Sequence, residues 1–150
     1  MCTSIRAVTS SNKKQVLQLN VAADQQGFIE SVSQCLQDAE EDSHYVPLAL
    51  YNHEQLIGFA MYGDFEGDIW LDRYLIDERF QGQGLGRAFF NALVEFLNER
   101  FPHKPLYLSV FKENVIAIRL YETTGFSFTH KLDENGEHIM MCPYQEKAFV

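Results

Sequence analysis

Apolar and polar residues follow two different periods along this chain of 150 residues. Short apolar runs bounded by turn residues predict β-strands, and apolar residues at spacings of three and four predict amphipathic helices. The predicted strands span residues 4–8, 45–51, 55–62, 68–76, 106–111, 126–132 and 137–144, and the predicted helices span residues 12–20, 28–39, 82–100 and 114–124. Strands alternate with helices in the middle of the chain, and hairpins stand at both ends. This order predicts a mixed α/β fold in which helices cover a central sheet.

Three turn signals refine the predicted topology. Asn52-His53-Glu54 separates two apolar runs and predicts an antiparallel hairpin. Pro47 cannot donate a ladder hydrogen bond, so the first strand of that hairpin is expected at a sheet edge or at a bulge. Asn135-Gly136 predicts a type I′ turn between the last two strands. Gly125 is expected to end the last helix.

Length and composition indicate a single domain over residues 1–150. Hydrophobic residues make up 46% and charged residues 22% of the chain, as in ordinary globular proteins. No apolar run reaches the roughly 20 residues of a membrane helix, and the first residues lack a signal-peptide pattern. We therefore expect a cytoplasmic protein. The three cysteines and five histidines lack metal-ligand spacing, so no metal is expected.

The charge is unevenly distributed. The net charge is −9, which argues against nucleic acid and anionic membranes as partners. Residues 1–72 hold 11 acidic and three basic residues, whereas residues 73–150 hold ten acidic and nine basic residues. Residues 73–119 hold seven basic and five acidic residues. The two halves are thus expected to meet partners of different charge, although a solvated acidic surface would also explain the excess.

One glycine-rich segment carries the clearest chemical signal. Gln81-Gly82-Gln83-Gly84-Leu85-Gly86-Arg87 follows a predicted strand and opens a predicted helix. Alternating glycines allow close approach of a ligand, and the free amides of a helix start suit phosphate. The segment lacks the Lys-Ser/Thr of a Walker loop, and Arg87 replaces the third glycine of a dinucleotide fingerprint. A tight connection without a ligand is the alternative.

Two motifs resemble those of the Gcn5-related N-acetyltransferases (GNAT). The segment from Gln81 to Gly86 matches that family's acetyl-CoA motif, Gln/Arg-x-x-Gly-x-Gly/Ala. A second motif follows at the expected separation, Asn114-x-x-Ala117-x-x-Leu120-Tyr121 and then Gly125-Phe126. Within the family, four further segments resemble the bacterial spermine/spermidine (diamine) acetyltransferases: residues 59–63, 70–73, 76–79 and 117–121.

The resemblance implies a fold and a cofactor site. The fold would be a mixed, mostly antiparallel sheet of about seven strands with about four helices, in which the fourth and fifth strands splay apart. Acetyl-CoA would pair its pantetheine arm with Tyr74, Leu75 and Ile76, and its pyrophosphate with the backbone from Gly82 to Arg87. The residues that the resemblance assigns to the cofactor are Tyr74, Leu75, Ile76, Gln81, Gly82, Gln83, Gly84, Leu85, Gly86, Arg87, Asn114, Ala117 and Tyr121.

The resemblance also gives Tyr121 a chemical role. Asn114 and Tyr121 are seven residues apart and share one helix face. The family assigns to this tyrosine the protonation of the departing thiolate, and Asn114 would bind pantetheine or an ordered water. The alternative for Tyr121 is an aromatic residue that only packs in the core.

The amine substrate requires a base and cation-binding groups. We expect Asp72 to accept the amine proton, since strand alternation would place it with Trp70, Tyr74 and Ile76 on one face. A structural ion pair with Arg73 is the alternative. The expected substrate-binding residues are Glu30, Glu40, Glu41, Trp70 and Asp72.

The predicted function is therefore acetyl transfer to a small polyamine such as spermidine or spermine, by direct attack in a ternary complex. An aminoglycoside, an amino acid or a protein N-terminus is the alternative acceptor. A non-catalytic acyl-CoA-binding module is a further alternative. The resemblance also suggests a homodimer.

Overall fold

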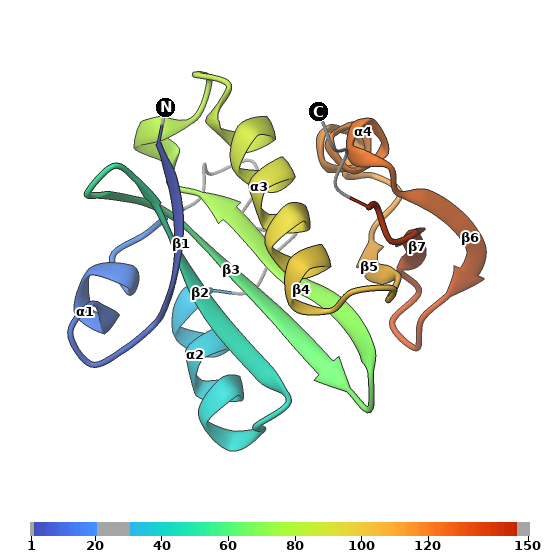
Figure 1. Cartoon of the computed structure of the whole chain (residues 1–150), viewed down its shortest axis with the longest axis horizontal. Helices are drawn as coiled ribbons and strands as arrows, with labels where there is room; N and C mark the ends of the chain where they lie inside the picture. The colour runs from blue at the N-terminus through green and yellow to red at the C-terminus, as the bar shows by residue number, and fades with distance from the viewer. Residues whose placement is uncertain (1, 21–30, 147–150) are drawn as a thin grey trace.

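The computed structural model describes residues 2–20 and 31–146, in which one mixed sheet forms the centre of the molecule. Its strand order is β1-β2-β3-β4-β5-β7-β6. Only β4 and β5 run parallel; the other neighbours are antiparallel. The strands are β1 Thr3–Ala7, β2 Tyr45–Asn52, β3 Gln55–Phe65, β4 Asp68–Ile76, β5 Leu106–Val110, β6 Ser127–Leu132 and β7 His138–Cys142. The predicted mixed, mostly antiparallel sheet is confirmed (Figure 1).

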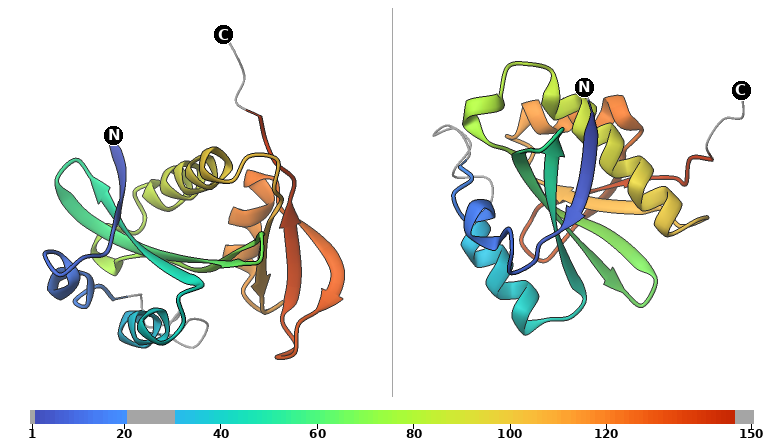
Figure 2. Two further views of the ribbon diagram at one scale, coloured as in Figure 1. Left: turned by 60° about the horizontal axis from the view of Figure 1, so that its bottom comes forward. Right: turned by 60° about the vertical axis from the view of Figure 1, so that its left-hand side comes forward.

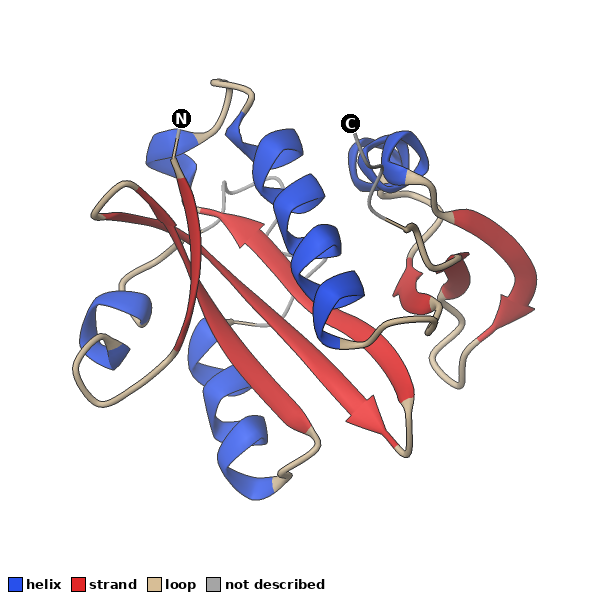
Figure 3. Cartoon of the chain, viewed as in Figure 1, coloured by secondary structure: helices blue, strands red, loops and turns tan. Residues whose placement is uncertain are grey.

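Four α-helices cover the two faces of this sheet within the described residues. They are α1 Lys13–Val16, α2 Val32–Glu41, α3 Leu85–Arg100 and α4 Val115–Thr124, and a 3₁₀ turn, η2 Glu78–Phe80, precedes α3. The helices α1 and α2 lie on one side of the sheet and α3 lies on the other, as Figure 2 and the colouring of Figure 3 show. The helix α4 packs beside α3, where the Phe90 and Tyr121 rings are 5.1 Å apart.

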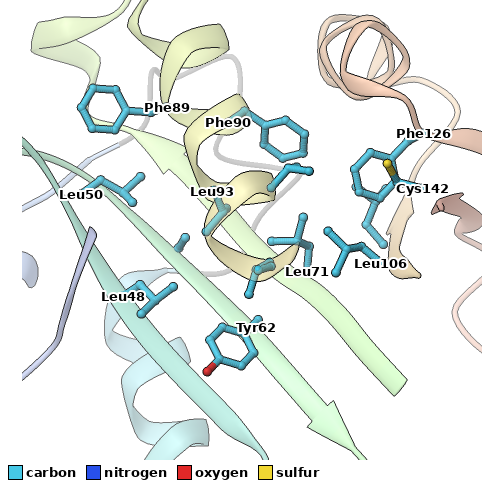
Figure 4. Close-up of a cluster of buried hydrophobic side chains, with 14 of the residues drawn as sticks. Leu48, Leu50, Tyr62, Leu71, Phe89, Phe90, Leu93, Leu106, Phe126 and Cys142 are labelled. Carbon is cyan, nitrogen blue, oxygen red and sulfur yellow. The ribbon is translucent and has the colours of Figure 1, made fainter. Parts of the chain in front are cut away.

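The two faces carry separate hydrophobic clusters. The larger cluster fills the space beneath α3, where Phe89, Phe90 and Leu93 are fully buried against the sheet (Figure 4). The smaller cluster lies beneath α1 and α2 and includes Val16 and Cys35. Burial of large apolar side chains on both faces supplies the main stabilising contribution, roughly 1.5–3 kcal/mol for each one removed from water. The central strands β3 and β4 are thereby fixed from both sides.

The first predicted helix is much shorter than expected. Residues 12–20 were expected to be helical, but only Lys13–Val16 forms α1. Beyond it the amides of Gln18 and Leu19 make short turns, and the Asn20 amide donates to the Asp77 carboxylate at 3.0 Å. That tertiary hydrogen bond draws the chain out of the helix. The second predicted helix, over residues 28–39, begins at Val32 within the described part of the chain, after the Ser31 cap, and extends to Glu41.

Two turn predictions are also corrected. The strand containing Pro47 is not an edge strand, because β2 lies between β1 and β3. Pro47 lies one position outside Leu48, the last β2 residue paired with β1, so its missing amide breaks no ladder. The register shift between β2 and β3 falls at Leu50/Tyr51, where Ile57 of β3 is the extra residue. The turn before β7 is not type I′, because Gly136 has a positive φ of 81° but Asn135 does not. The Gly136 amide closes it by donating to the Asp133 carbonyl.

A bulge in β4 controls what this strand presents to each face. Met61 of β3 pairs with Arg73 and Tyr62 pairs with Leu71, so Asp72 is an extra residue without an opposite partner. Leu71 and Ile76 both lie in the cluster beneath α3, although plain alternation would put them on opposite faces. The expectation that Trp70, Asp72, Tyr74 and Ile76 share a face is therefore wrong.

Candidate active site

A cleft opens where β4 and β5 separate. The two strands pair only at Ile69 with Leu106 and at Trp70 with Tyr107, which confirms the predicted splay. Beyond that point the strands diverge around a cavity. The lining residues come from β4, α3, β5, α4 and the start of β7; they are Leu71, Asp72, Arg73, Tyr74, Phe90, Leu108, Ser109, Val110, Phe111, Asn114, Tyr121 and Glu137.

The edge of β4 facing this cleft offers peptide groups that β5 does not pair. The Asp77 amide donates to the Ile57 carbonyl of β3, so alternation directs the peptide groups of Tyr74 and Ile76 toward β5. The peptide groups of Leu75 face β3 instead. Its carbonyl oxygen lies so close to Gly58 of β3 that a Cβ built on that glycine would be only 2.5 Å from it. Of the three predicted pantetheine-binding residues, Tyr74 and Ile76 therefore present main chain to the cleft and Leu75 does not. The Gln81 side chain donates to the Ile76 carbonyl at 2.9 Å.

The glycine-rich turn forms an open cradle at the start of α3. Gly82 and Gly84 both adopt left-handed backbone, with φ of 78° and 77°, and nothing lies within 4 Å of a Cβ placed on either. Helix α3 begins at Leu85, with Gly84 as its cap, so the predicted start at residue 82 was early. The first α3 hydrogen bond runs from the Ala88 amide to the Gly84 carbonyl, which leaves the amides of residues 85–87 without an acceptor inside the helix. This geometry suits an anionic group such as a pyrophosphate.

Side chains hold that cradle in place. The Tyr74 hydroxyl donates to the Gly86 carbonyl and so ties β4 to the first turn of α3. Burial strongly raises the pKa of Tyr74, which keeps this donor protonated. The Leu85 side chain is buried, whereas Gln83 and Arg87 are exposed at the surface of the turn. The guanidinium of Arg79, in the turn before the cradle, donates to the Asp77 carboxylate at 2.8 Å.

Helix α4 brings Asn114 and Tyr121 to the same cavity. Asn114 caps the helix, and its side-chain oxygen accepts from the Ala117 amide at 3.4 Å. Ala117 packs its own side chain against the larger cluster. Tyr121 is half-buried beside Phe90 and Phe126, at ring distances of 5.1 and 6.2 Å. The capping role of Asn114 is additional to any contact with a cofactor.

The surroundings of Tyr121 preserve its phenolic proton. Desolvation by burial, and secondarily the charge of Glu137, raise the pKa of Tyr121 to about 12. A phenol of this kind remains protonated throughout the physiological range. It therefore carries a proton that a thiolate leaving a thioester can take up, and it is unsuited to accept one from an ammonium.

On the opposite side of the bulge, carboxylates and aromatic rings gather. Asp72 contacts the Arg73 guanidinium at 3.5 Å, so the ion pair weighed as an alternative is present. Trp70 stacks on Tyr107 at a ring distance of 5.2 Å. Burial, and then the charges of Asp72, Asp42 and Asp38, raise the pKa of Tyr45. The charges at the acidic end of α2 and of Asp72 in the β4 bulge thus act together on Tyr45, and the charge of Arg73 opposes them.

The remaining predicted substrate-binding acids lie farther from the cavity or outside the described residues. Glu40 pairs with Lys13 at 2.8 Å, and Glu41 accepts from Gln37 at 3.2 Å. Neither lines the cavity. Glu30 falls within residues 21–30, outside the described part of the chain. Of the four predicted residues that the structure describes, only Asp72 borders the cleft.

Sequence reasoning did not identify Glu137 as a site residue. This residue follows the Asp133–Gly136 turn and reaches the cavity because β7 pairs with β5, where His138 lies opposite Val110. Its carboxylate accepts a hydrogen bond from the Ser109 hydroxyl and contacts the Asp133 carboxyl. A charged residue between a turn and a strand is an ordinary surface pattern, so only the strand pairing could have identified it.

No group of three or more His, Cys, Asp or Glu side chains in residues 2–20 and 31–146 is arranged to hold a metal. None of the helices described there is long and apolar enough to cross a bilayer.

Comparison with known proteins places this geometry in a family context. Residues 13–126 match the model of the acetyltransferase (GNAT) family. The chain is 46% identical to a spermine/spermidine N(1)-acetyltransferase of Bacillus subtilis, over 94% of this chain and 98% of that protein. Among solved structures, spermidine N-acetyltransferase from Vibrio cholerae in complex with CoA and spermine superposes with a TM-score of 0.73, at 19% identity and 95% coverage of both chains. An aminoglycoside acetyltransferase in complex with coenzyme A gives a TM-score of 0.77, at 17% identity and 95% coverage of both chains.

Proposed function

Because the chain belongs to the acetyltransferase (GNAT) family, we propose that it transfers the acetyl group of acetyl-CoA to a primary amine of a small polyamine such as spermidine or spermine. The observation that carries the polyamine assignment is the 46% identity to the Bacillus subtilis spermine/spermidine acetyltransferase across nearly the full length of both chains. The negative field around the bulge of β4 supports it, because a polyamine is a polycation.

In this proposal the cofactor is bound mainly by main chain. The peptide groups of Tyr74 and the amide of Ile76 pair with the pantetheine arm, and the amides of residues 85–87 donate hydrogen bonds to the pyrophosphate. The residues fit this role, since the left-handed glycines leave room in the cradle and the cleft beside β4 is lined on its far side by Asn114 and Tyr121. Acetyl-CoA supplies an activated thioester.

The chain's own groups then complete a direct transfer. The amine nitrogen attacks the thioester carbonyl carbon, the carbon–sulfur bond breaks, and Tyr121 donates its phenolic proton to the departing sulfur. Asp72 lies at the same cavity and supplies negative charge toward the ammonium groups of the substrate. Trp70 and Tyr107 offer an aromatic surface to the methylene chain. The reaction needs no covalent acetyl-enzyme.

An amine panel tests this function. Free thiol is measured as acetyl-CoA is consumed with spermidine, spermine, putrescine, an aminoglycoside, an amino acid and a peptide with a free N-terminus. We expect spermidine and spermine to give the highest kcat/KM. Faster turnover of a non-polyamine would overturn the substrate assignment, and CoA binding without thiol release on any amine would indicate a non-catalytic binding module.

A further inference from the structure

The proposed reaction leaves one proton without an acceptor. A polyamine nitrogen is mostly protonated near pH 7 and must lose a proton before its lone pair can attack. Tyr121 is a donor at this pH, because burial raises its pKa to about 12. Asp72 already contacts the Arg73 guanidinium at 3.5 Å, and that cation competes with an ammonium for the same carboxylate.

Glu137 is a second carboxylate in the same cavity. It borders the cleft together with Asn114 and Tyr121, and its charge acts on the Tyr121 phenol. The register of β5 and β7 fixes its position: His138 pairs with Val110 and Ile139 with Ser109, so Glu137 reaches diagonally to the Ser109 hydroxyl. The turn before β7 fixes its backbone, since the Glu137 amide donates to the Asp133 side chain at 2.9 Å.

The groups around Glu137 shift the pKa of its carboxyl in the direction that favours proton exchange. Burial, and then the Asp133 carboxyl, raise the pKa of Glu137 above its ordinary value, while Arg73 and the hydrogen bond from Ser109 act in the opposite direction. A carboxylate with a raised pKa is a stronger base than an exposed glutamate. The charged and titratable groups that face it are Asp133, Arg73 and Tyr121.

From this geometry we infer that Glu137 is the general base of the proposed acetyl transfer. Glu137 takes one proton from the substrate ammonium, and the neutral nitrogen forms the new carbon–nitrogen bond as the carbon–sulfur bond breaks. Tyr121 protonates the sulfur and recovers a proton from the acylated nitrogen through solvent; Glu137 releases its proton to solvent. The balance is ammonium plus acetyl-CoA giving N-acetylamine, CoA thiol and one proton. The inference rests on the proposed function.

The decisive experiment compares Glu137→Gln with a matched control, Glu134→Gln. Glu134 lies in the same turn but is exposed and outside the cavity. With spermidine at pH 7, we expect Glu137→Gln to lower kcat about a hundredfold, the typical contribution of general base catalysis, and Glu134→Gln to leave it unchanged. CoA affinity, measured by calorimetry, should be the same in both variants and in the wild type.

The pH profile separates a base from a merely structural residue. In the wild type, kcat/KM should rise with pH through the raised pKa of Glu137, because the base must be deprotonated. Glu137→Gln should lose this inflection, and its deficit should shrink toward high pH as the free amine becomes neutral. A deficit that is constant with pH would overturn the inference.

Two parallel variants keep the result interpretable. Asp72→Asn should raise KM more than it lowers kcat and should retain the acidic inflection; loss of the inflection in Asp72→Asn alone would assign the base to Asp72 instead. Ser109→Ala removes only the hydrogen bond to Glu137, and should shift the inflection to higher pH because that bond favours the carboxylate. An unshifted inflection in a folded Ser109→Ala variant would count against Glu137, even if Glu137→Gln fails to fold.

Failure of the function and failure of the base assignment are distinguishable. If wild-type protein turns over another amine but no polyamine, the substrate proposal fails and the Glu137 comparison is made on that amine. If wild-type protein turns over spermidine and Glu137→Gln equals it at every pH, only the base assignment fails.

Discussion

The two sides of the cleft at β4 present different kinds of groups. Toward α3, the cleft offers main chain: the peptide groups of Tyr74, the amide of Ile76 and the amides at the start of the helix. Toward α2 and β7, it offers side chains, namely the carboxylates of Asp72 and Glu137. A main-chain site suits a co-substrate that is shared by a whole family. A side-chain site can be changed residue by residue, which suits the acceptor.

The strongest test of this division is Tyr121→Phe, because Tyr121 is the one side chain to which the proposal gives chemistry on the cofactor side. The variant retains the ring that packs on Phe90 and removes only the phenolic proton. We expect kcat to fall about a hundredfold or more while CoA affinity stays nearly intact. Steady-state kinetics and calorimetry measure the two quantities. A loss of CoA binding with the fold preserved would contradict the proton-donor role.

A smaller effect is expected from a change to the main-chain cradle. Gly84→Ala places a Cβ in the open space of the cradle, and a non-glycine residue in left-handed backbone costs roughly 1–2 kcal/mol. We expect the Kd for CoA to rise about tenfold. Thermal melting should show a modest loss of stability.

Gly136→Ala is the matched control for that variant. Gly136 has a similar φ of 81° and equally open surroundings, but lies in the turn before β7. The control should lose similar stability without changing CoA affinity. Equal CoA affinity in Gly84→Ala and the wild type would contradict the proposal that the glycine-rich turn binds the cofactor.

The smallest effect concerns the acidic end of α2. Neutralising Glu40, Glu41 and Asp42 together should raise the KM for spermidine about twofold at low salt and leave it unchanged at high salt, because this effect acts through the field rather than through contact. The structure favours a small value, since Lys13 already pairs with Glu40 and His44 with Asp42. The triple Glu95→Gln, Glu122→Gln and Glu134→Gln variant makes the same charge change at exposed positions elsewhere. An equal rise in KM in that control variant would show that Glu40, Glu41 and Asp42 have no specific effect on spermidine binding.

Sequence reasoning was accurate where the structure depends on local backbone. The glycine-rich turn that opens α3, and the placement of Asn114 and Tyr121 on one face of α4, follow from residues that are adjacent or seven positions apart, so their spacing is visible in the chain. The strand and helix order was predictable for the same reason, because each element carries its own hydrophobic period.

The predictions failed where distant segments decide the geometry. The bulge at Asp72 arises from the register between β3 and β4, and strand alternation alone cannot reveal it. Helix α1 ends early because Asn20 is bound by Asp77, a residue 57 positions away. Glu137 reaches the cavity through the pairing of β7 with β5, which skips α4 and β6 in the sequence. In each case a contact between distant segments overrides the structure that the local sequence pattern favours.

The bulge at Asp72 also affects how the two substrates enter and how the products leave. Since the strand exchanges faces at this residue, Tyr74 lies beneath α3 while Asp72 acts on Tyr45 toward α2. In the proposed complex the two substrates therefore approach from opposite faces of the sheet and meet where β4 and β5 separate. If the two products lie on opposite faces of the sheet as proposed, we expect CoA and the acetylated amine to leave in either order.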